Sequence, residues 1–419
     1  MHVLVVGLNY NTAPLEVREK LALGSWRLKE ALVSLFDHVP EGIILSTCNR
    51  TEVYTLADEH YSERKSVEDF LSELADMSVS ELSPHLYAFQ QETAVSHLFR
   101  IASGLESMIL GEFEVLGQVR QALQDAENTG RISTPLLNLF RQAVRVGRQA
   151  RLETGISRNS VSVSSIAIEL AKKTFDDLSS CKVLVISAGE AGKLAVKALV
   201  KHGISQLIVT SRSYEKALAL ASAHGGKATP FHHLKEPLIE ADILISSSGA
   251  PHFILEPSVV AEAMQSRPHR PLVLIDIAVP RDIDPRVKDI ENVYLYDIDD
   301  LETVSGSNRR QRAKEKEKVM TIIDAEVAKF MSWWHSLEAV PTITALVSKA
   351  EKIRRSQLTR TLGRMQMSEE DRAAIDAMTQ TIIKKILHDP IRYLRNSDQR
   401  DNHIQAVQEL FDLDNNVSS

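Results

Sequence analysis

Residues 183–192, Val-Leu-Val-Ile-Ser-Ala-Gly-Glu-Ala-Gly, predict the first strand and turn of a doubly wound α/β domain. Four apolar residues form a buried strand, small residues follow, and residues 193–201 continue with helical spacing. In this context backbone N–H groups at the start of the helix bind a pyrophosphate, and small residues let it approach closely. The pattern therefore predicts a dinucleotide site formed by the following residues: Ser187, Ala188, Gly189, Glu190, Ala191 and Gly192.

Ser187 stands where the dinucleotide-binding pattern has its first glycine. If this position requires a positive φ angle, a serine is strained there, because its Cβ crowds the backbone. We therefore expect this site to bind its cofactor somewhat more weakly than a site with glycine at this position. The alternative is a tight strand-to-helix turn that binds no ligand.

The second strand of this domain, predicted over residues 207–210, ends in Ser211-Arg212-Ser213. An enzyme that uses NADH usually has an acidic side chain here, which binds the ribose hydroxyls. Serine and arginine suit a 2′-phosphate instead. Ser211 and Arg212 therefore predict NADPH as the cofactor, with Arg212 as the main determinant, and the alternative is an ordinary exposed arginine.

Further apolar strands, predicted over residues 243–246, 272–277 and 293–296, alternate with helical stretches and indicate a parallel sheet. The preceding part, residues 1–156, has the order βαββαβ of a ferredoxin-like α+β domain, followed by helices. Its strands are expected over residues 2–8, 42–47, 51–57 and 85–89. A polar stretch at 157–165 then interrupts the periodicity and marks the boundary between these two domains.

The C-terminal part is predicted to be all helical. Charged and aliphatic residues at helical spacing over 301–340 indicate one long helix that ends near Pro341. Residues 341–419 continue as shorter helices, divided near Gly363 and again at Asp389-Pro390. Because these helices cannot bury their own apolar stripes, we expect a helical domain through which two copies of the chain dimerise.

The composition is that of a globular protein, with 43% hydrophobic and 25% charged residues among 419, a length that suits two or three domains. No apolar run approaches the roughly 20 residues that span a bilayer, and the first ten residues lack the basic start of a signal peptide. We therefore expect a cytoplasmic protein that does not enter a membrane.

The net charge of −7 argues against a general nucleic-acid binder, yet residues 301–400 hold 19 Lys and Arg against 13 Asp and Glu. A solvated helix with many charges of both signs explains this local excess, and a localised acidic partner is the alternative. The pair His232-His233 has no acidic or cysteine partner at ligand spacing, so we predict no metal site there.

The two cysteines, Cys48 and Cys181, are too few for a disulfide framework or a four-cysteine zinc site. Cys48 lies in a turn between two predicted strands, beside Arg50, whose cation would favour the thiolate. Cys181 is expected to be structural. A thiolate beside a reduced nicotinamide can take up an acyl group as a thioester for reduction to an aldehyde, and the acyl donor could be a phosphate, a thioester or an aminoacyl ester.

Four segments resemble signatures of the glutamyl-tRNA reductase family, in the family's order: 46–54 (STCNRTEVY), 97–118 (HLFRIASGLESMILGEFEVLGQ), 186–192 (ISAGEAG) and 274–285 (LIDIAVPRDIDP). The resemblance implies reduction of L-glutamyl-tRNA with NADPH to glutamate-1-semialdehyde, the first step of the five-carbon route to tetrapyrroles. It also implies a V-shaped homodimer with four parts: a catalytic domain (1–156), an NADPH domain (157–300), a spinal helix (301–340) and a dimerisation domain (341–419).

The resemblance also assigns residues. It implies that Cys48 is the nucleophile and that His97, on an apolar helix face where a core histidine is the default, orients the ester or assists proton transfer. Arg50 is suited to the glutamate side-chain carboxylate and Glu112 to the α-ammonium group. The implied substrate contacts are Thr47, Asn49, Arg50, Ser107, Glu112, Phe113, Glu114 and Gln118, with Phe113 and Glu114 standing where the family often has Pro and Gln.

The implied partners are tRNA(Glu) charged with glutamate, a second copy of the chain, and the glutamate-1-semialdehyde aminomutase that acts next. Two other functions are compatible with the residues. A shikimate-type NADP dehydrogenase with extra domains would use Arg212 and would not need Cys48. A catalytically silent paralogue that binds tRNA or a partner would explain the departures at Ser187 and Phe113.

Overall fold

The structure is a computed structural model, and it forms two compact units, Met1–Val327 and Ala328–Ser419, which are described separately below. It describes residues 2–57, 62–157, 163–175, 177–204, 206–301, 309–363, 368–396 and 400–413. Most of the polar stretch expected at the first domain boundary, and the expected start of the long helix, lie outside these ranges.

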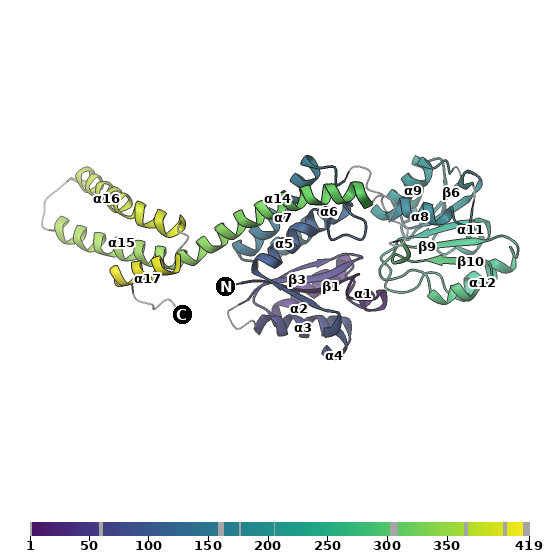
Figure 1. The fold of residues 1–419 in the computed structure, drawn as a ribbon, viewed down its shortest axis with the longest axis horizontal. Coiled ribbons are helices and arrows are strands. Elements are labelled where there is room, and N and C mark those ends of the chain that lie inside the picture. The colour runs from purple at the N-terminus through teal and green to yellow at the C-terminus, as the bar shows by residue number, and fades with distance from the viewer. Residues whose placement is uncertain are drawn as a thin grey trace. The chain divides into compact units, whose positions relative to one another are not determined.

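The first unit begins with a four-stranded antiparallel sheet in the order β2-β3-β1-β4, which confirms the ferredoxin-like arrangement. Helices cover both faces of this sheet (Figure 1), so β1 and β3 are buried along nearly their whole length. The strands are β1 (His2–Asn9), β2 (Ile43–Ser46), β3 (Arg50–Ala57) and β4 (Tyr87–Gln90). The helices are α1 (Leu15–Leu21), α2 (Ser25–His38), α3 (Ser62–Ala75), α4 (Val79–Leu82), η1 (Ser83–His85), α5 (Gln91–Ala102), α6 (Glu114–Thr129) and α7 (Thr134–Glu153).

A six-stranded parallel sheet follows in the order β10-β9-β8-β5-β6-β7. The strand order reverses between β5 and β8, and in doubly wound sheets ligands bind at the carboxyl ends of the strands at such a point. The strands are β5 (Lys182–Ile186), β6 (Gln206–Ser211), β7 (Lys227–Pro230), β8 (Ile243–Ser246), β9 (Leu272–Asp276) and β10 (Val293–Tyr296). The helices are α8 (Val163–Ala171), η2 (Leu178–Ser180), α9 (Glu190–Lys201), α10 (Tyr214–Ala223), α11 (Lys235–Glu240), α12 (Pro257–Gln265) and η3 (Pro285–Asp289).

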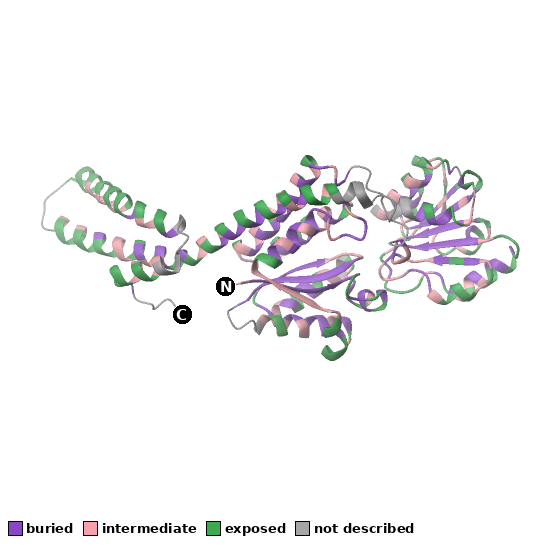
Figure 2. Ribbon diagram, viewed as in Figure 1, coloured by how far each residue is buried: buried purple, intermediate pink, exposed green. Residues whose placement is uncertain are grey.

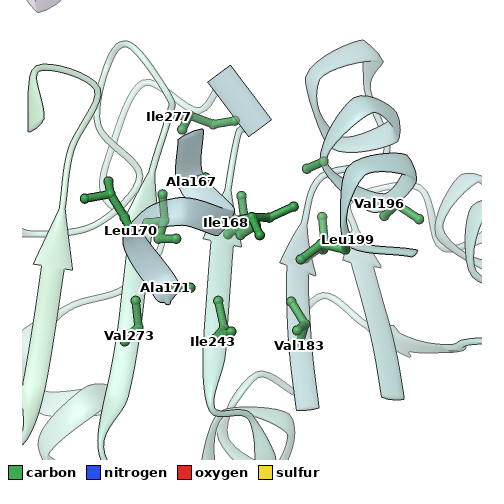
Figure 3. Packing of buried hydrophobic residues seen from close by; sticks show 14 of the residues in the cluster. Ala167, Ile168, Leu170, Ala171, Val183, Val196, Leu199, Ile243, Val273 and Ile277 are labelled. Atoms are coloured by element: carbon green, nitrogen blue, oxygen red, sulfur yellow. The ribbon is translucent and has the colours of Figure 1, made fainter. Parts of the chain in front are cut away.

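The core on one face of the parallel sheet is built by aliphatic side chains of α8 and α9 against the central strands. Ile168 and Leu199 from the helices pack over Val183, Ile243 and Val273 from β5, β8 and β9 (Figure 3). The same cluster extends beyond the sheet, since it includes side chains of the N-terminal part: Leu15, Met108 and Ile109, with Tyr10 and Cys48 packed against it. Side chains of α1 and of the loop before α6 therefore pack onto the hydrophobic core of the parallel sheet, while the antiparallel sheet has a core of its own.

The second unit is helical, as predicted. It contains the end of α14 (Arg309–Ser336), then η5 (Leu337–Ala339), α15 (Val340–Leu362), α16 (Glu369–Asn396) and α17 (Arg400–Leu410). The expected division near Gly363 is confirmed, because α15 ends there. The division expected at Asp389-Pro390 is wrong, since Pro390 lies inside α16.

The helix continues through Pro390 because packing holds it on both sides. Leu387 is buried against Leu346 of α15, and one turn beyond the proline Leu394 is buried against Ile343. These contacts outweigh the backbone hydrogen bond that a proline removes. Figure 2 shows that α15 and α16 still expose much of their surface.

Candidate active site

Cys48 lies in a tight turn between β2 and β3, as the sequence predicts. The Thr47 Oγ1 atom accepts hydrogen bonds from the backbone N–H groups of Asn49 (3.1 Å) and Arg50 (3.2 Å). The N–H of Thr47 donates to the carbonyl of Arg50 at 2.8 Å, and the N–H of Tyr10 donates to the carbonyl of Asn49 at 3.0 Å. Hydrogen bonds on both sides therefore hold the turn that carries the thiol.

The surroundings of Cys48 favour the thiol over the thiolate. Burial raises its pKa to about 12, the carboxylates of Glu112 and Glu114 add to the rise, and Arg18 works against it. Arg18 donates from Nη1 to the carbonyl of Cys48 at 3.2 Å. The expectation that Arg50 would favour the thiolate is wrong for this structure, because burial and two nearby carboxylates dominate.

A buried charge cluster, which we call the Glu52 cluster, lies on β3 directly after the turn. Arg50 donates from Nη1 to Glu52 Oε1 at 2.8 Å and from Nη2 to the carbonyl of Glu106. Tyr54 and Tyr87 donate to the same carboxylate at 2.6 and 2.5 Å. Burial by itself would raise the pKa of Glu52, but His97 and Arg50 outweigh burial and hold this pKa well below its usual range. Glu52 is therefore an ionised carboxylate with no solvent exposure.

His97 belongs to the Glu52 cluster. Its Nε2 atom lies 3.0 Å from Glu52 Oε1, and its ring packs against the rings of Tyr87 and Phe89. Since an ionised carboxylate only accepts, Nε2 is the donor of this hydrogen bond. That Nδ1 atom is buried without a hydrogen-bond partner. The structure thus joins His97 to Arg50 through Glu52, a residue that the sequence analysis missed.

The remaining predicted substrate residues lie on the loop before α6 and on α6 itself. Arg151 fixes this loop by donating to the carbonyls of Ala102 (2.6 Å) and Glu112 (2.9 Å). Burial raises the pKa of Glu112 to about 7. Ser107 is buried, Gln118 is half-buried, and Glu114 begins α6. Phe113 exposes 63% of its surface, more than any other aromatic residue that the structure describes.

The predicted dinucleotide turn has the expected geometry. Ser187 has a φ angle of 110°, so the missing first glycine does leave a strained serine. A Cβ atom on Gly192 would lie 2.2 Å from the carbonyl oxygen of Ser187, so only glycine fits there. Gly189 caps α9, which places the first N–H groups of that helix beside the turn.

A cavity of about 330 Å³ opens at this turn. It brings Ser187, Ala188 and Gly189 together with Ser211 and Arg212 at the end of β6, as the sequence predicts. It also brings in residues that were not predicted: Ser213, Lys216, Phe231, Ser248, Gly249, Ala250 and Ile254. Lys216 adds a second cation near Arg212. It lies in the first turn of α10, shortly after the end of β6, and this position is the feature by which the sequence could have identified it.

Two buried aspartates organise the loops at the carboxyl ends of β8 and β9. Asp282 accepts from the N–H of Ser248 at 2.7 Å and from the hydroxyls of Ser246 and Ser248. Asp276 accepts from the N–H groups of Asp282 and Ile283, both at 2.8 Å. Burial raises the pKa of both carboxyls. Both lie in the segment 274–285 that resembles the family signature, but the sequence did not reveal what they bind.

Cys181 and the pair His232-His233, which the sequence analysis also discussed, show no sign of a catalytic or metal-binding role. Cys181 is buried, and burial raises its pKa to about 11. The rings of His232 and His233 contact each other edge to face. Within the described ranges, no three His, Cys, Asp or Glu side chains are grouped as a metal site would require. No helix in the described part of the chain has the length and apolar character to cross a membrane.

Comparisons with known proteins agree along the whole chain. The profile "Glutamyl-tRNAGlu reductase, N-terminal domain" matches residues 6–154, "Shikimate / quinate 5-dehydrogenase" matches 169–304, and "Glutamyl-tRNAGlu reductase, dimerisation domain" matches 318–413. The glutamyl-tRNA reductase of Geotalea daltonii is 41% identical over 99% of this chain and 97% of its own. That of Bacillus subtilis is 40% identical over 99% and 92%. The solved glutamyl-tRNA reductase from Methanopyrus kandleri aligns with a TM-score of 0.50 and 31% identity, covering 98% of this chain and 99% of its own.

Proposed function

The chain belongs to the glutamyl-tRNA reductase family, and we propose that it reduces the glutamyl group of glutamyl-tRNA with NADPH to glutamate-1-semialdehyde and free tRNA. The observation that carries this proposal is the packing of Cys48 against the core of the nucleotide-binding sheet. The turn that carries Cys48 leads directly into the strand that carries the Glu52 cluster. A thiol that can hold an acyl group thus lies beside a domain built to hold a hydride donor.

In the first step Cys48 takes the glutamyl group. The sulfur bonds to the ester carbonyl carbon, the bond from that carbon to the ribose oxygen of the tRNA breaks, and the thiol proton passes to this oxygen. Because Glu112 and Glu114 help to raise the pKa of Cys48, a substrate α-ammonium group beside them would lower it again. Binding of the glutamyl group would thus increase the fraction of Cys48 that is thiolate.

Arg50 is the group proposed to bind the substrate's side-chain carboxylate. A guanidinium has five N–H donors, and the structure gives those of Arg50 two partners, Glu52 and the carbonyl of Glu106, so a substrate carboxylate that reaches this buried side chain would bind the remaining donors. Glu52 also orients His97, whose Nδ1 atom has no partner in the structure and is the atom proposed to exchange a proton with the ester. Thr47 and Asn49 shape the turn, while Ser107 lies on the loop before α6 and Gln118 on α6, and both are proposed to contact the glutamyl group.

When bound, NADPH supplies the hydride that converts the thioester to the aldehyde, with release of the Cys48 thiolate. The turn Ser187–Gly192 suits a pyrophosphate, because α9 begins there with its first N–H groups and Gly192 lets this helix pack against the carbonyl of Ser187. Arg212 and Lys216 line the same cavity and suit a 2′-phosphate. We expect Arg212→Ala to remove most of the preference for NADPH over NADH, measured as the ratio of the two Kd values, and an unchanged ratio would refute the assignment.

A homodimer fits the exposed apolar side chains of the second unit, and the dimerisation profile covers the same residues. These side chains are Ile353, Met378, Ile382, Ile386 and Tyr393, each 48–64% exposed. We further propose that the enzyme works in the cytoplasm, where reducing conditions keep Cys48 free. A contact with the following aminomutase would protect the reactive aldehyde from water.

The deciding experiment incubates the protein with glutamylated tRNA and NADPH and follows NADPH oxidation and aldehyde formation. We expect Cys48→Ser to lower the rate by about 100-fold or more, because an alkoxide is not available at neutral pH. Equal rates for the two proteins would refute the mechanism. Shikimate oxidation by the Cys48→Ser protein would favour the dehydrogenase alternative, and absence of NADPH fluorescence on binding would favour the silent paralogue.

A further inference from the structure

Helix α1 connects the N-terminal part of the first unit to the nucleotide-binding part through an ion pair. Glu19 Oε1 accepts from the backbone N–H of Arg281 at 2.7 Å and from its Nε at 2.8 Å, and Oε2 accepts from Nη2 at 2.9 Å. The side chains of Arg281 and Glu19 are only 11% and 16% exposed. This bidentate ion pair is largely shielded from water. It therefore has a defined geometry and is only weakly screened by salt.

A second contact of α1 reaches the thiol turn itself. Arg18 is 2% exposed and donates to the carbonyl of Cys48 at 3.2 Å, while its other nitrogen, Nη2, donates to the carboxylate of Asp299 after β10. Neighbouring residues of α1 therefore bind the turn that carries the nucleophile and two different loops of the nucleotide-binding part.

The far end of the Glu19–Arg281 pair is tied to the nucleotide cavity. Arg281 immediately precedes Asp282, whose carboxylate binds Ser248 through both its N–H and its hydroxyl. Ser248 lines the nucleotide cavity. The wall of that cavity is thus connected to α1 and the Cys48 turn by hydrogen bonds of Asp282, Arg281 and Arg18 that are joined through adjacent residues of the backbone.

We propose that Glu19 and Arg281 are positioning residues that hold the nucleotide-binding part against the Cys48 turn for reduction of the thioester, an inference that rests on the proposed function. Hydride transfer needs the donor and the thioester carbon to be nearly in contact, whereas acylation of Cys48 by glutamyl-tRNA needs no nucleotide. Loss of the pair therefore slows reduction selectively and uncovers Cys48, which is half-buried against the core of the parallel sheet.

The chain's two cysteines allow a direct test in the cofactor-free protein. Iodoacetamide labelling of Cys48 and Cys181 is followed by mass spectrometry in the wild type, Glu19→Gln, Arg281→Gln and the double variant. We expect Cys48 to react about fivefold faster or more in each variant through local opening, with the double variant no faster than the quicker single. Cys181 is buried inside the nucleotide-binding part and should keep its rate. An unchanged rate at Cys48, or equal rises at both cysteines, would overturn the proposal.

Arg286→Gln is the matched control, because Arg286 lies five residues further on and pairs with Asp284 within the nucleotide-binding part. It should leave both labelling rates unchanged. In single-turnover experiments with glutamyl-tRNA, we expect Glu19→Gln and Arg281→Gln to form the thioester and bind NADPH as the wild type does, but to form aldehyde about 10- to 100-fold more slowly. Parallel loss of acylation would overturn the proposal, whereas a wild type that forms no thioester would refute the proposed function instead.

Discussion

Glu52 organises the candidate site, because its buried carboxylate binds four other side chains. The sequence does not reveal this role. In the segment STCNRTEVY the charged residues Arg50 and Glu52 alternate with Thr51 and Val53, which is the pattern of a strand with one face in water. The burial of Glu52 comes from Tyr87 on β4 and His97 on α5, which lie 35 and 45 residues away in the chain. Cys48 and Arg50, by contrast, were recognised because the strand-turn-strand pattern is local.

Replacing Glu52 by glutamine tests its role as hub. The change leaves Arg50 buried without its counter-charge, and the loss of one partner of a buried ion pair costs about 3–5 kcal/mol of unfolding free energy. Urea denaturation measures this loss, and steady-state assays should show a fall in kcat/KM for glutamyl-tRNA. Tyr54→Phe removes one hydrogen bond to the same carboxylate and should cost about 1 kcal/mol. Equal stability of Glu52→Gln and wild type would contradict the buried pair.

The pH dependence of Cys48 reactivity follows from its neighbours. Because Glu112 raises the pKa of Cys48, Glu112→Gln lowers that pKa, increases the thiolate fraction at pH 8 and speeds alkylation of Cys48 by iodoacetamide. The midpoint of the rate against pH should move to lower pH. Glutamyl transfer should nevertheless slow, since the proposed ammonium contact is lost.

Glu153→Gln serves as the control for this experiment, because Glu153 is exposed at the end of α7. Its alkylation profile should overlay that of the wild type. A profile for Glu112→Gln that moves to higher pH, or does not move, would show that Glu112 does not act on the thiol.

At the scale of elements, buried parallel strands were the most predictable part of the fold. β8 and β10 have the predicted bounds, since each is a short run of apolar and aromatic residues, and β8 is buried along its whole length. β7 was missed because Lys227–Pro230 is a short, half-buried edge strand that ends in proline. The continuation of α16 through Pro390 was likewise unpredictable, because contacts with α15 decide it.

The strand-turn-helix element that opens the nucleotide domain makes a prediction about Gly192. In Gly192→Ala the new Cβ would meet the carbonyl oxygen of Ser187 at 2.2 Å, so the turn must move away from the helix start. We expect NADPH to bind about tenfold more weakly or worse, measured by fluorescence titration, because the backbone N–H groups lose their alignment on the pyrophosphate. Gly117→Ala, a helix position with open space around it, should bind NADPH normally. Normal binding by Gly192→Ala would contradict the placement of the cofactor.

At the scale of the whole molecule, the sequence predicted the order of the parts but not the contacts between them. The thiol turn and the dinucleotide turn were each recognised from local patterns, 139 residues apart by the numbers of Cys48 and Ser187. The connection through Glu19 and Arg281 depends on two exposed-looking charges whose pairing no spacing reveals. Short sequence motifs therefore predict the individual reactive residues. The contacts that bring these residues together depend on tertiary packing, which the motifs do not reveal.

The last prediction concerns the dimer. Ile382 and Ile386 lie one helical turn apart on α16 and are 48% and 64% exposed, so the double change to glutamate places two charges in the proposed interface. Light scattering after gel filtration should then give the monomer mass of 46.7 kDa instead of about twice that value. Val33→Glu, at an apolar position on α2 that is 69% exposed, should leave the dimer intact.

The monomeric variant also tests where the chemistry lies. All residues proposed to bind glutamate or NADPH belong to the unit Met1–Val327, so each copy should contain a full set of these groups. We expect the variant to keep NADPH binding and acylation of Cys48 within about twofold of the wild type, because mutations distant from a site act on it independently. If the mass falls and acylation is lost with it, the partner copy must contribute to the active site or to tRNA binding, and the single-chain account of the site would be wrong.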